Sequence, residues 1–207
     1  MSNFQSEAEQ MAYAMGMNMG EYVAQMAIEL DGAQIAAGLA DYLTGSPKLA
    51  PEAYRAAMEQ LQQRMKAAGE QESAALGQAN REEEAGFMAE NGREEGVKTT
   101  ASGLQYRVVE EGSGARPAIN DKVRVHYQGS LLNGEVFDSS IARGEPLELM
   151  LTQVIPGWTE GLQLMPVGSK YRFFIPSKLG YGERGAGQAI PPCAALIFDV
   201  ELLAIVE

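Results

Sequence analysis

Residues 122–138 read KVRVHYQGSLLNGEVFD and alternate apolar with polar side chains over most of their first half. β-Branched and aromatic residues in alternation are typical of a strand with one buried face. Asn133-Gly134 is a dipeptide that strongly favours a tight turn between strands. The pattern therefore predicts a strand over Lys122–Leu132 and its continuation, after the turn, over Glu135–Asp138.

Similar short runs predict four more strands, Leu104–Glu110, Leu147–Leu151, Lys170–Pro176 and Ala195–Val206. Between two of these runs, Gly157–Leu164 can form one short helix. Many strands and a single helix indicate an α+β fold, in which an antiparallel sheet wraps around that helix.

The preceding half of the chain has a different composition. Residues 1–97 carry 16 acidic and 6 basic residues, whereas residues 98–207 carry 12 and 10. The first part is rich in Ala, Met, Glu and Gln, which favour helices, and Asn91–Gly96 looks like a helix end followed by a hinge. We therefore expect an all-helical dimerisation domain over 1–50, a long connecting helix and hinge over 51–97, and the α+β domain over 98–207.

The helical half should contain a helix over about Phe4–Leu30 with methionines along one face, and a short helix over Ala33–Leu43. Pro51 then opens a long helix that can run to about Asn91. The polar part of that helix, Gly69–Glu84, is expected to be a solvated arm. The Met-rich face is either an intradomain core or a dimer interface. About 45 residues of short helices offer too little core to stand alone, which favours the dimer.

Charge and rare residues exclude several functions. The net charge is -12, from 16 basic and 28 acidic residues, which argues against nucleic acid or an anionic membrane as the main partner. One cysteine, Cys193, allows no internal disulfide, and one histidine and one cysteine disfavour a zinc site. We read no secretory signal or membrane span at the N-terminus, and we expect a cytoplasmic location.

Residues that could suggest nucleotide binding or nucleophilic catalysis lie in sequence surroundings that do not fit these functions. Gly180–Gly185 matches G-x-G-x-x-G, but Pro191-Pro192 follows where a nucleotide-binding helix would be needed, so we expect a long glycine-rich loop. His126 in an alternating strand and Cys193 after two prolines are interpreted as structural residues. The run Glu82–Glu84 is interpreted as a solvated helix face.

Aromatic and aliphatic residues gather near the predicted turns, together with Asp138 and Arg143. The apolar members are Tyr127, Phe137, Val154, Ile155, Trp158, Tyr181, Ile190 and Phe198. On pattern alone they can all be core residues. The alternative is that they line a pocket, with the charged pair at its edge.

Six motifs in this half resemble those of the FKBP-type peptidyl-prolyl cis-trans isomerases. They are, in order, Val125–Gly129, Val136–Ser140, Val154–Trp158, Met165–Ser169, Tyr181–Ala186 and Ile190–Leu202. The Met-rich helices and the long helix are similar to the bacterial Mip-like and FklB-like subfamily, in which the N-terminal helices make a homodimer. The resemblance implies a rotamase that acts on proline-containing unfolded or partly folded polypeptides and needs no cofactor or metal.

The resemblance also implies roles for individual residues. Trp158 would form the floor of the pocket, and the side walls would be Tyr127, Phe137 and Phe198. Val154 and Ile155 would line one rim, where the backbone N–H of Ile155 would donate a hydrogen bond to the bound chain. Tyr181 would offer its hydroxyl to a substrate carbonyl, Arg143 would hold Asp138 at the edge, and Ile190 would close the far side. Asp138, Tyr181, Phe137 and Trp158 would be the catalytic set.

Some positions depart from the family pattern. Leu147 and Leu149 stand where aromatic residues are common, and Ala189 replaces a bulkier residue. These rim changes bear on substrate preference and on affinity for the family's macrolide inhibitors, which the resemblance implies as further ligands. The alternative to the enzyme is a chaperone that holds unfolded chains in the same pocket or between the arms of a dimer.

Overall fold

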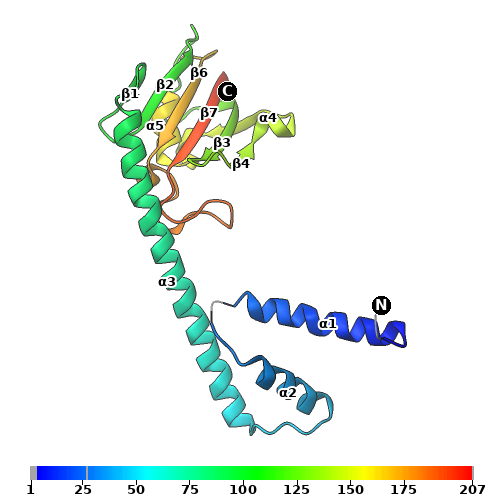
Figure 1. The fold of residues 1–207 in the computed structure, drawn as a ribbon. Coiled ribbons are helices and arrows are strands. Elements are labelled where there is room, and N and C mark those ends of the chain that lie inside the picture. Colours follow the sequence, from blue (N-terminus) through cyan, green and yellow to red (C-terminus); the bar gives the residue numbers. More distant parts are fainter. Residues whose placement is uncertain (1–3, 27, 207) are drawn as a thin grey trace. The chain divides into compact units, whose positions relative to one another are not determined.

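The computed structural model describes residues 4–26 and 28–206, which form two compact units divided between Glu72 and Ser73 (Figure 1). The first unit contains α1 (Glu7–Ala24), α2 (Gly32–Leu43) and the first part of α3 (Pro51–Asn91). None of the helices in these described ranges is long and apolar enough to cross a membrane.

Side-chain caps set the beginnings of α1 and α2. The Ser6 hydroxyl accepts from the Glu9 N–H at 3.2 Å, and the Asp31 carboxylate accepts from the Ala33 N–H at 2.8 Å. Both capping residues have extended backbones, as such caps require. The first helix, Glu7–Ala24, is shorter than the predicted Phe4–Leu30, of which residue 27 lies outside the described residues. The second helix agrees with its prediction to within one residue.

The second unit is built on one antiparallel sheet with the strand order β1-β2-β6-β7-β3-β4, and β5 pairs with the first part of β3. The strands are β1 (Val97–Thr99), β2 (Gln105–Glu110), β3 (Lys122–Leu131), β4 (Val136–Ser139), β5 (Leu147–Met150), β6 (Lys170–Ile175) and β7 (Leu196–Val206). Six of them match the predicted runs, and the α+β fold with the sheet around a short helix is confirmed. Strand β1 was not predicted from the sequence.

Helix α5 (Pro156–Gln163) packs on the buried face of this sheet (Figure 1). Alternate residues of β7, from Leu196 to Leu202, are buried beneath it, as the period of a half-buried strand requires. A Cβ at Gly161 would lie 2.6 Å from the Phe173 ring, so glycine lets the helix backbone approach β6 closely.

The last turns of α3 belong to this second unit, so the prediction of a solvated arm over Gly69–Glu84 is wrong there. Glu84 accepts from the Ser177 N–H at 2.7 Å, Phe87 lies 5.7 Å from Phe174 between ring centroids, and Asn91 donates to Gln105 at 2.7 Å. Helical spacing places these residues on one side of α3. The boundary between the two compact units thus lies inside α3, between Glu72 and Ser73, whereas the boundary predicted from the sequence lies near residue 97.

Candidate active site

A cavity of about 590 Å³ opens at one end of the sheet, where β3, β4, β5, α5, β7 and the glycine-rich loop meet. Its lining residues are Tyr127, Phe137, Asp138, Leu147, Leu149, Gln153, Val154, Ile155, Trp158, Tyr181, Ala186, Ala189, Ile190 and Phe198. Nine of the ten predicted site residues are among them. The tenth, Arg143, joins the site through hydrogen bonds to two of the lining residues.

Aromatic rings meet edge to face in the deep part of this cavity. Trp158, only 5% exposed, lies 5.1 Å from Tyr127 and 5.2 Å from Phe198 between ring centroids, with interplanar angles of 84° and 83°. Phe137 meets Phe198 at 5.5 Å and 81°. Such contacts are favourable and directional, so the four rings form an apolar wall of fixed shape. Pro156 at the first turn of α5 sets the helix start that presents Trp158.

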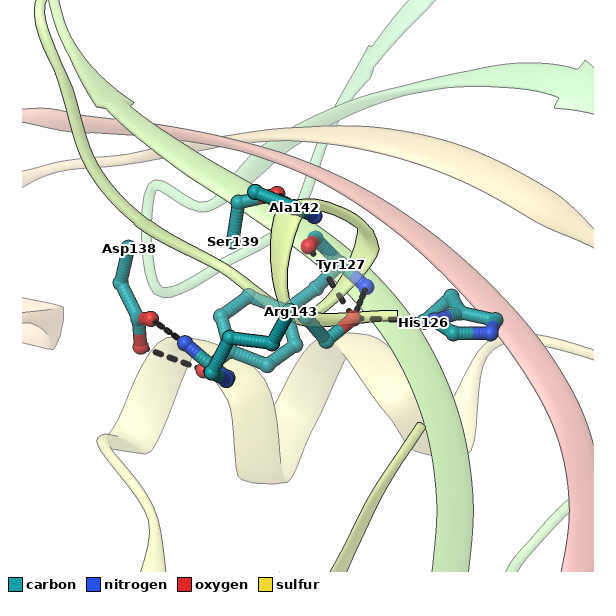
Figure 2. A network of polar contacts seen from close by, with 7 residues as sticks. His126, Tyr127, Asp138, Ser139, Ala142 and Arg143 are labelled. Carbon is teal, nitrogen blue, oxygen red and sulfur yellow. Dashed lines mark hydrogen bonds and ion pairs between the residues drawn. The ribbon is translucent and has the colours of Figure 1, made fainter. Parts of the chain in front are cut away.

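A polar group of three residues lies at the edge of the aromatic wall (Figure 2). The Tyr127 hydroxyl donates to one oxygen of Asp138, and Arg143 donates to the other. Arg143 also donates to the Tyr127 hydroxyl at 3.0 Å. Burial alone would raise the pKa of Asp138, but the bonds from Tyr127 and Arg143 outweigh it and lower that pKa below 3.8. The carboxylate is thus ionised and its direction is fixed.

Helix α4 (Ser140–Arg143), which the sequence analysis missed, places Arg143 beside Asp138. It is capped by Ser139, whose hydroxyl accepts from the Ala142 N–H at 3.1 Å. Ser140 is fully buried, and its hydroxyl accepts from the Tyr127 N–H at 2.8 Å and lies 3.1 Å from Nδ1 of His126 (Figure 2). His126 is therefore a structural partner of Ser140, as interpreted from the sequence. The sequence feature that could have predicted α4 is the Ser139-Ser140 pair. Ser139 caps the helix, and Ser140 bonds it to Tyr127.

The opposite rim combines an aliphatic edge with a tyrosine. The Ile155 carbonyl accepts from the Trp158 N–H at 2.9 Å, whereas the Ile155 N–H has no protein acceptor within residues 4–26 and 28–206. Tyr181 is 41% exposed, and burial followed by the nearby charge of Asp138 raises the pKa of its hydroxyl above 10.0. This hydroxyl therefore keeps its proton at neutral pH and can donate it in a hydrogen bond.

The sequence analysis did not place Gln153 and Ala186 in the site, and it treated Leu147, Leu149 and Ala189 only as departures on the rim. All five line the cavity. Gln153 directly precedes the motif residue Val154, and adjacency is the signal that could have included it. The glycine-rich loop is confirmed as a loop: it contains a short 3-10 turn, Gly182–Arg184, and a similar turn, Ser177–Leu179, directly precedes it.

Comparison with known proteins agrees with this architecture. Residues 114–203 match the family model described as FKBP-type peptidyl-prolyl cis-trans isomerase. Residues 8–108 match the model of the domain amino terminal to that isomerase. The chain belongs to the FKBP-type peptidyl-prolyl cis-trans isomerases.

Individual relatives of this FKBP-type isomerase match along nearly its whole length. The FKBP-type 22 kDa peptidyl-prolyl cis-trans isomerase of Escherichia coli strain K12 is 45% identical, with 98% of this chain and 97% of that protein aligned. FkpA of Aeromonas hydrophila is 46% identical over 95% of this chain and 76% of its own. The crystal structure of FkpA from Escherichia coli superposes with a TM-score of 0.82 at 36% identity, and covers 98% of both chains.

The FKBP-type assignment establishes the reaction class, which is rotation about Xaa-Pro peptide bonds. The cited relatives favour the isomerase over the chaperone alternative, and their architecture agrees with the Mip-like resemblance. Among residues 4–26 and 28–206, no group of three or more His, Cys, Asp or Glu side chains could hold a metal ion.

Proposed function

We propose that the aromatic cavity is the catalytic site, and that it binds the proline ring of an Xaa-Pro segment against Trp158. The observation that supports this most directly is the edge-to-face packing of Tyr127 and Phe198 on that indole, with Phe137 packed edge to face on Phe198. A concave apolar wall with a few polar groups at its edge is the usual form of a small-ligand site, and about 590 Å³ lies within the usual size range.

The proposed catalysis needs no acid or base. Rotation about a peptide bond has a barrier of about 18–20 kcal/mol, because the twisted amide loses its resonance. The twisted amide has less C–N double-bond character and a more ketone-like carbonyl. An apolar cavity favours this less polar form over the planar amide, and holding the proline ring leaves the preceding residue to rotate. Catalysis is then tighter binding of the twisted form.

We propose that the edge residues orient the substrate and stabilise the rotating bond. The Tyr181 hydroxyl is protonated and half-exposed, so it can donate to a substrate carbonyl. The Ile155 N–H is a second donor on the same rim. Asp138 is ionised and fixed by Tyr127 and Arg143, so it can interact with the carbonyl region as it rotates. Val154 and Ile190 close the remaining sides of the cavity.

The test is the cis-to-trans rate of a short Xaa-Pro peptide with and without the full-length protein. We expect acceleration by the wild type and its loss in Trp158→Ala. Circular dichroism of that variant shows whether the sheet is still folded. If folded Trp158→Ala accelerated the reaction as well as the wild type, the catalytic site would lie elsewhere.

We propose that the chain is a homodimer through its N-terminal helices. No residue of α1 or α2 is buried within the described chain, although α1 carries four methionines. The Met11 side chain is 61% exposed and the Met15 side chain 70%. In an isolated protomer these apolar side chains would lie in water, whereas a dimer interface would cover them. Light scattering after size exclusion should give twice the protomer mass of 22.3 kDa. A monomeric mass would contradict the interface.

We propose two further properties, a ligand class and a location. Macrolide inhibitors of the family are proposed ligands, because the cavity is apolar and has the right size; they should compete with the peptide substrate in the rotamase assay. A cytoplasmic location is supported by the single, buried cysteine, since small exported domains commonly rely on disulfides. Cell fractionation tests the location.

A further inference from the structure

The glycine-rich loop of the cavity is hydrogen-bonded to α3 on both sides. Before the loop, the Ser177 N–H donates to Glu84 at 2.7 Å. After it, Asn80 donates from its amide to the Pro192 carbonyl at 2.7 Å. Tyr181 lies four residues after the first anchor, and Ile190 lies two residues before the second. Both cavity-lining side chains are therefore held between contacts with one rigid helix.

Internal bonds make the loop between these anchors a closed unit. Ala186 and Ile190 exchange two backbone hydrogen bonds, of 2.9 and 3.1 Å. The Cys193 N–H donates to the Gly182 carbonyl at 2.9 Å. Because the loop is closed on itself, a displacement at Pro192 is transmitted to Ile190, and through Gly182 to Tyr181.

Cys193 has a strained backbone that its surroundings must stabilise. Its φ is +57°, in the left-handed region that L-residues with a side chain rarely occupy. Conformations of this kind persist where neighbouring contacts determine them. Here the neighbours come from α3: Arg81 donates to the Cys193 sulfur at 3.0 Å, and Gly77 lies next to that side chain. The side chain is only 3% exposed beneath the helix.

We propose that Asn80 and Glu84 of α3 are positioning residues for the substrate cavity, acting through the loop that carries Tyr181 and Ile190. The inference deepens the proposed function and rests on it. It assigns part of the catalytic module to a helix that lies outside the residues matched by the isomerase family model, 114–203. It predicts that substrate affinity depends on two polar side chains that lie outside the lining of the cavity.

The experiment compares full-length Asn80→Ala/Glu84→Ala with the wild type in two assays. Loss of the two anchors should raise KM roughly fivefold while kcat changes less than twofold, because the walls and the Asp138 group are untouched. Reaction of Cys193 with a thiol reagent should become faster, since the sole cysteine is covered by α3 only while the loop is docked.

Two matched variants separate positioning from a general effect on α3. Glu84→Gln keeps an acceptor oxygen for the Ser177 N–H and, paired with Asn80, should restore most of the affinity. Glu82→Ala removes the same charge from the same helix and should leave both assays unchanged, because among the described residues Glu82 bonds only the neighbouring Gln78 side chain. Unchanged KM and unchanged thiol reactivity in the double variant would overturn the inference.

A measurement on the wild type covers the case in which the double variant does not fold. If α3 docking orders the loop for substrate, saturating Xaa-Pro peptide must favour the docked state in return. The peptide should therefore slow the reaction of Cys193, and an unchanged reaction rate would overturn the inference. Failure of the proposed function is distinct from both results, because it requires that folded Trp158→Ala retain wild-type turnover.

Discussion

Gly129 lies on β3 between the two aromatic walls of the cavity, and its replacement by alanine tests whether those walls are rigid. It pairs with Phe198 on one side and with Asp138 on the other. A Cβ at this position would lie 2.6 Å from the Phe198 ring and 2.7 Å from the Phe137 ring. Ordinary carbon contacts are about 3.5–4.0 Å, so both rings would have to move by about 1 Å.

The expected size of the effect follows from that displacement. Extra methylenes in a packed core cost about 1–3 kcal/mol. The reduced freedom of the unfolded chain offsets about 0.4–1 kcal/mol of this. The net loss should be about 1–2 kcal/mol of unfolding free energy, which lowers Tm by about 4–8 °C for a unit of this size. A displacement of about 1 Å in a catalytic site can cost about a hundredfold, so we expect kcat/KM to fall by between tenfold and a hundredfold.

Trp158 provides the stability assay, because it is the sole tryptophan and lies in the affected wall. Its fluorescence during thermal unfolding reports on the second unit, and the Xaa-Pro peptide assay reports the rate. Gly86→Ala is the matched control: apart from its own helix backbone and chain neighbours, no atom of the described residues lies within 4 Å of a Cβ built there, and alanine in an exposed helix is favoured by about 1 kcal/mol. The control should raise stability and leave the rate unchanged.

The reasoning would be refuted if Gly129→Ala kept wild-type Tm and kcat/KM. That result would mean that the Phe137 and Phe198 rings move aside at no cost. The shape of the aromatic wall would then not explain catalysis.

Three further predictions concern the same cavity. Asp138→Ala should lower kcat/KM by about tenfold with an unchanged circular dichroism spectrum, because a charge-assisted group is lost from an exposed edge; full activity would remove Asp138 from the site. Trp158→Ala should destabilise the second unit by about 3–5 kcal/mol, as measured by urea unfolding, since it empties the floor of a packed cluster; a loss under 1 kcal/mol would contradict the packing. The kcat/KM should be flat between about pH 5 and pH 9: the lowered pKa of Asp138 keeps it ionised above 3.8, and the raised pKa values of Tyr127 and Tyr181 keep them protonated below 10.0. A step near pH 6–7 would require a different titrating group.

Local patterns in the sequence were sufficient for most of the secondary structure. The alternation from Val123 to Tyr127 predicts β3 because a strand places successive side chains on opposite faces. Pro51 and the helix-forming composition after it predict α3 to its last residue, Asn91. The site residues were predicted through ordered motifs, and the structure places nine of them on one cavity.

Long-range contacts could not be read from such patterns. Helix α4 has only four residues, too few to show a helical period. It is stabilised by the hydrogen bond between Ser140 and Tyr127, which lies on strand β3. The side of α3 that holds Asn80 and Glu84 is polar, and polarity alone predicts a face in water. Whether such side chains meet solvent or backbone groups depends on which loop folds against them.

Composition, periodicity and motif order depend on neighbours along the chain, and for this protein they established the α+β sheet, the helical first half and the isomerase family. The strained Cys193 and the anchoring of the cavity loop to α3 depend on groups up to 112 residues apart. Such pairs are brought together only when the loop folds against α3, because their hydrogen bonds form between segments whose local sequences do not predict each other.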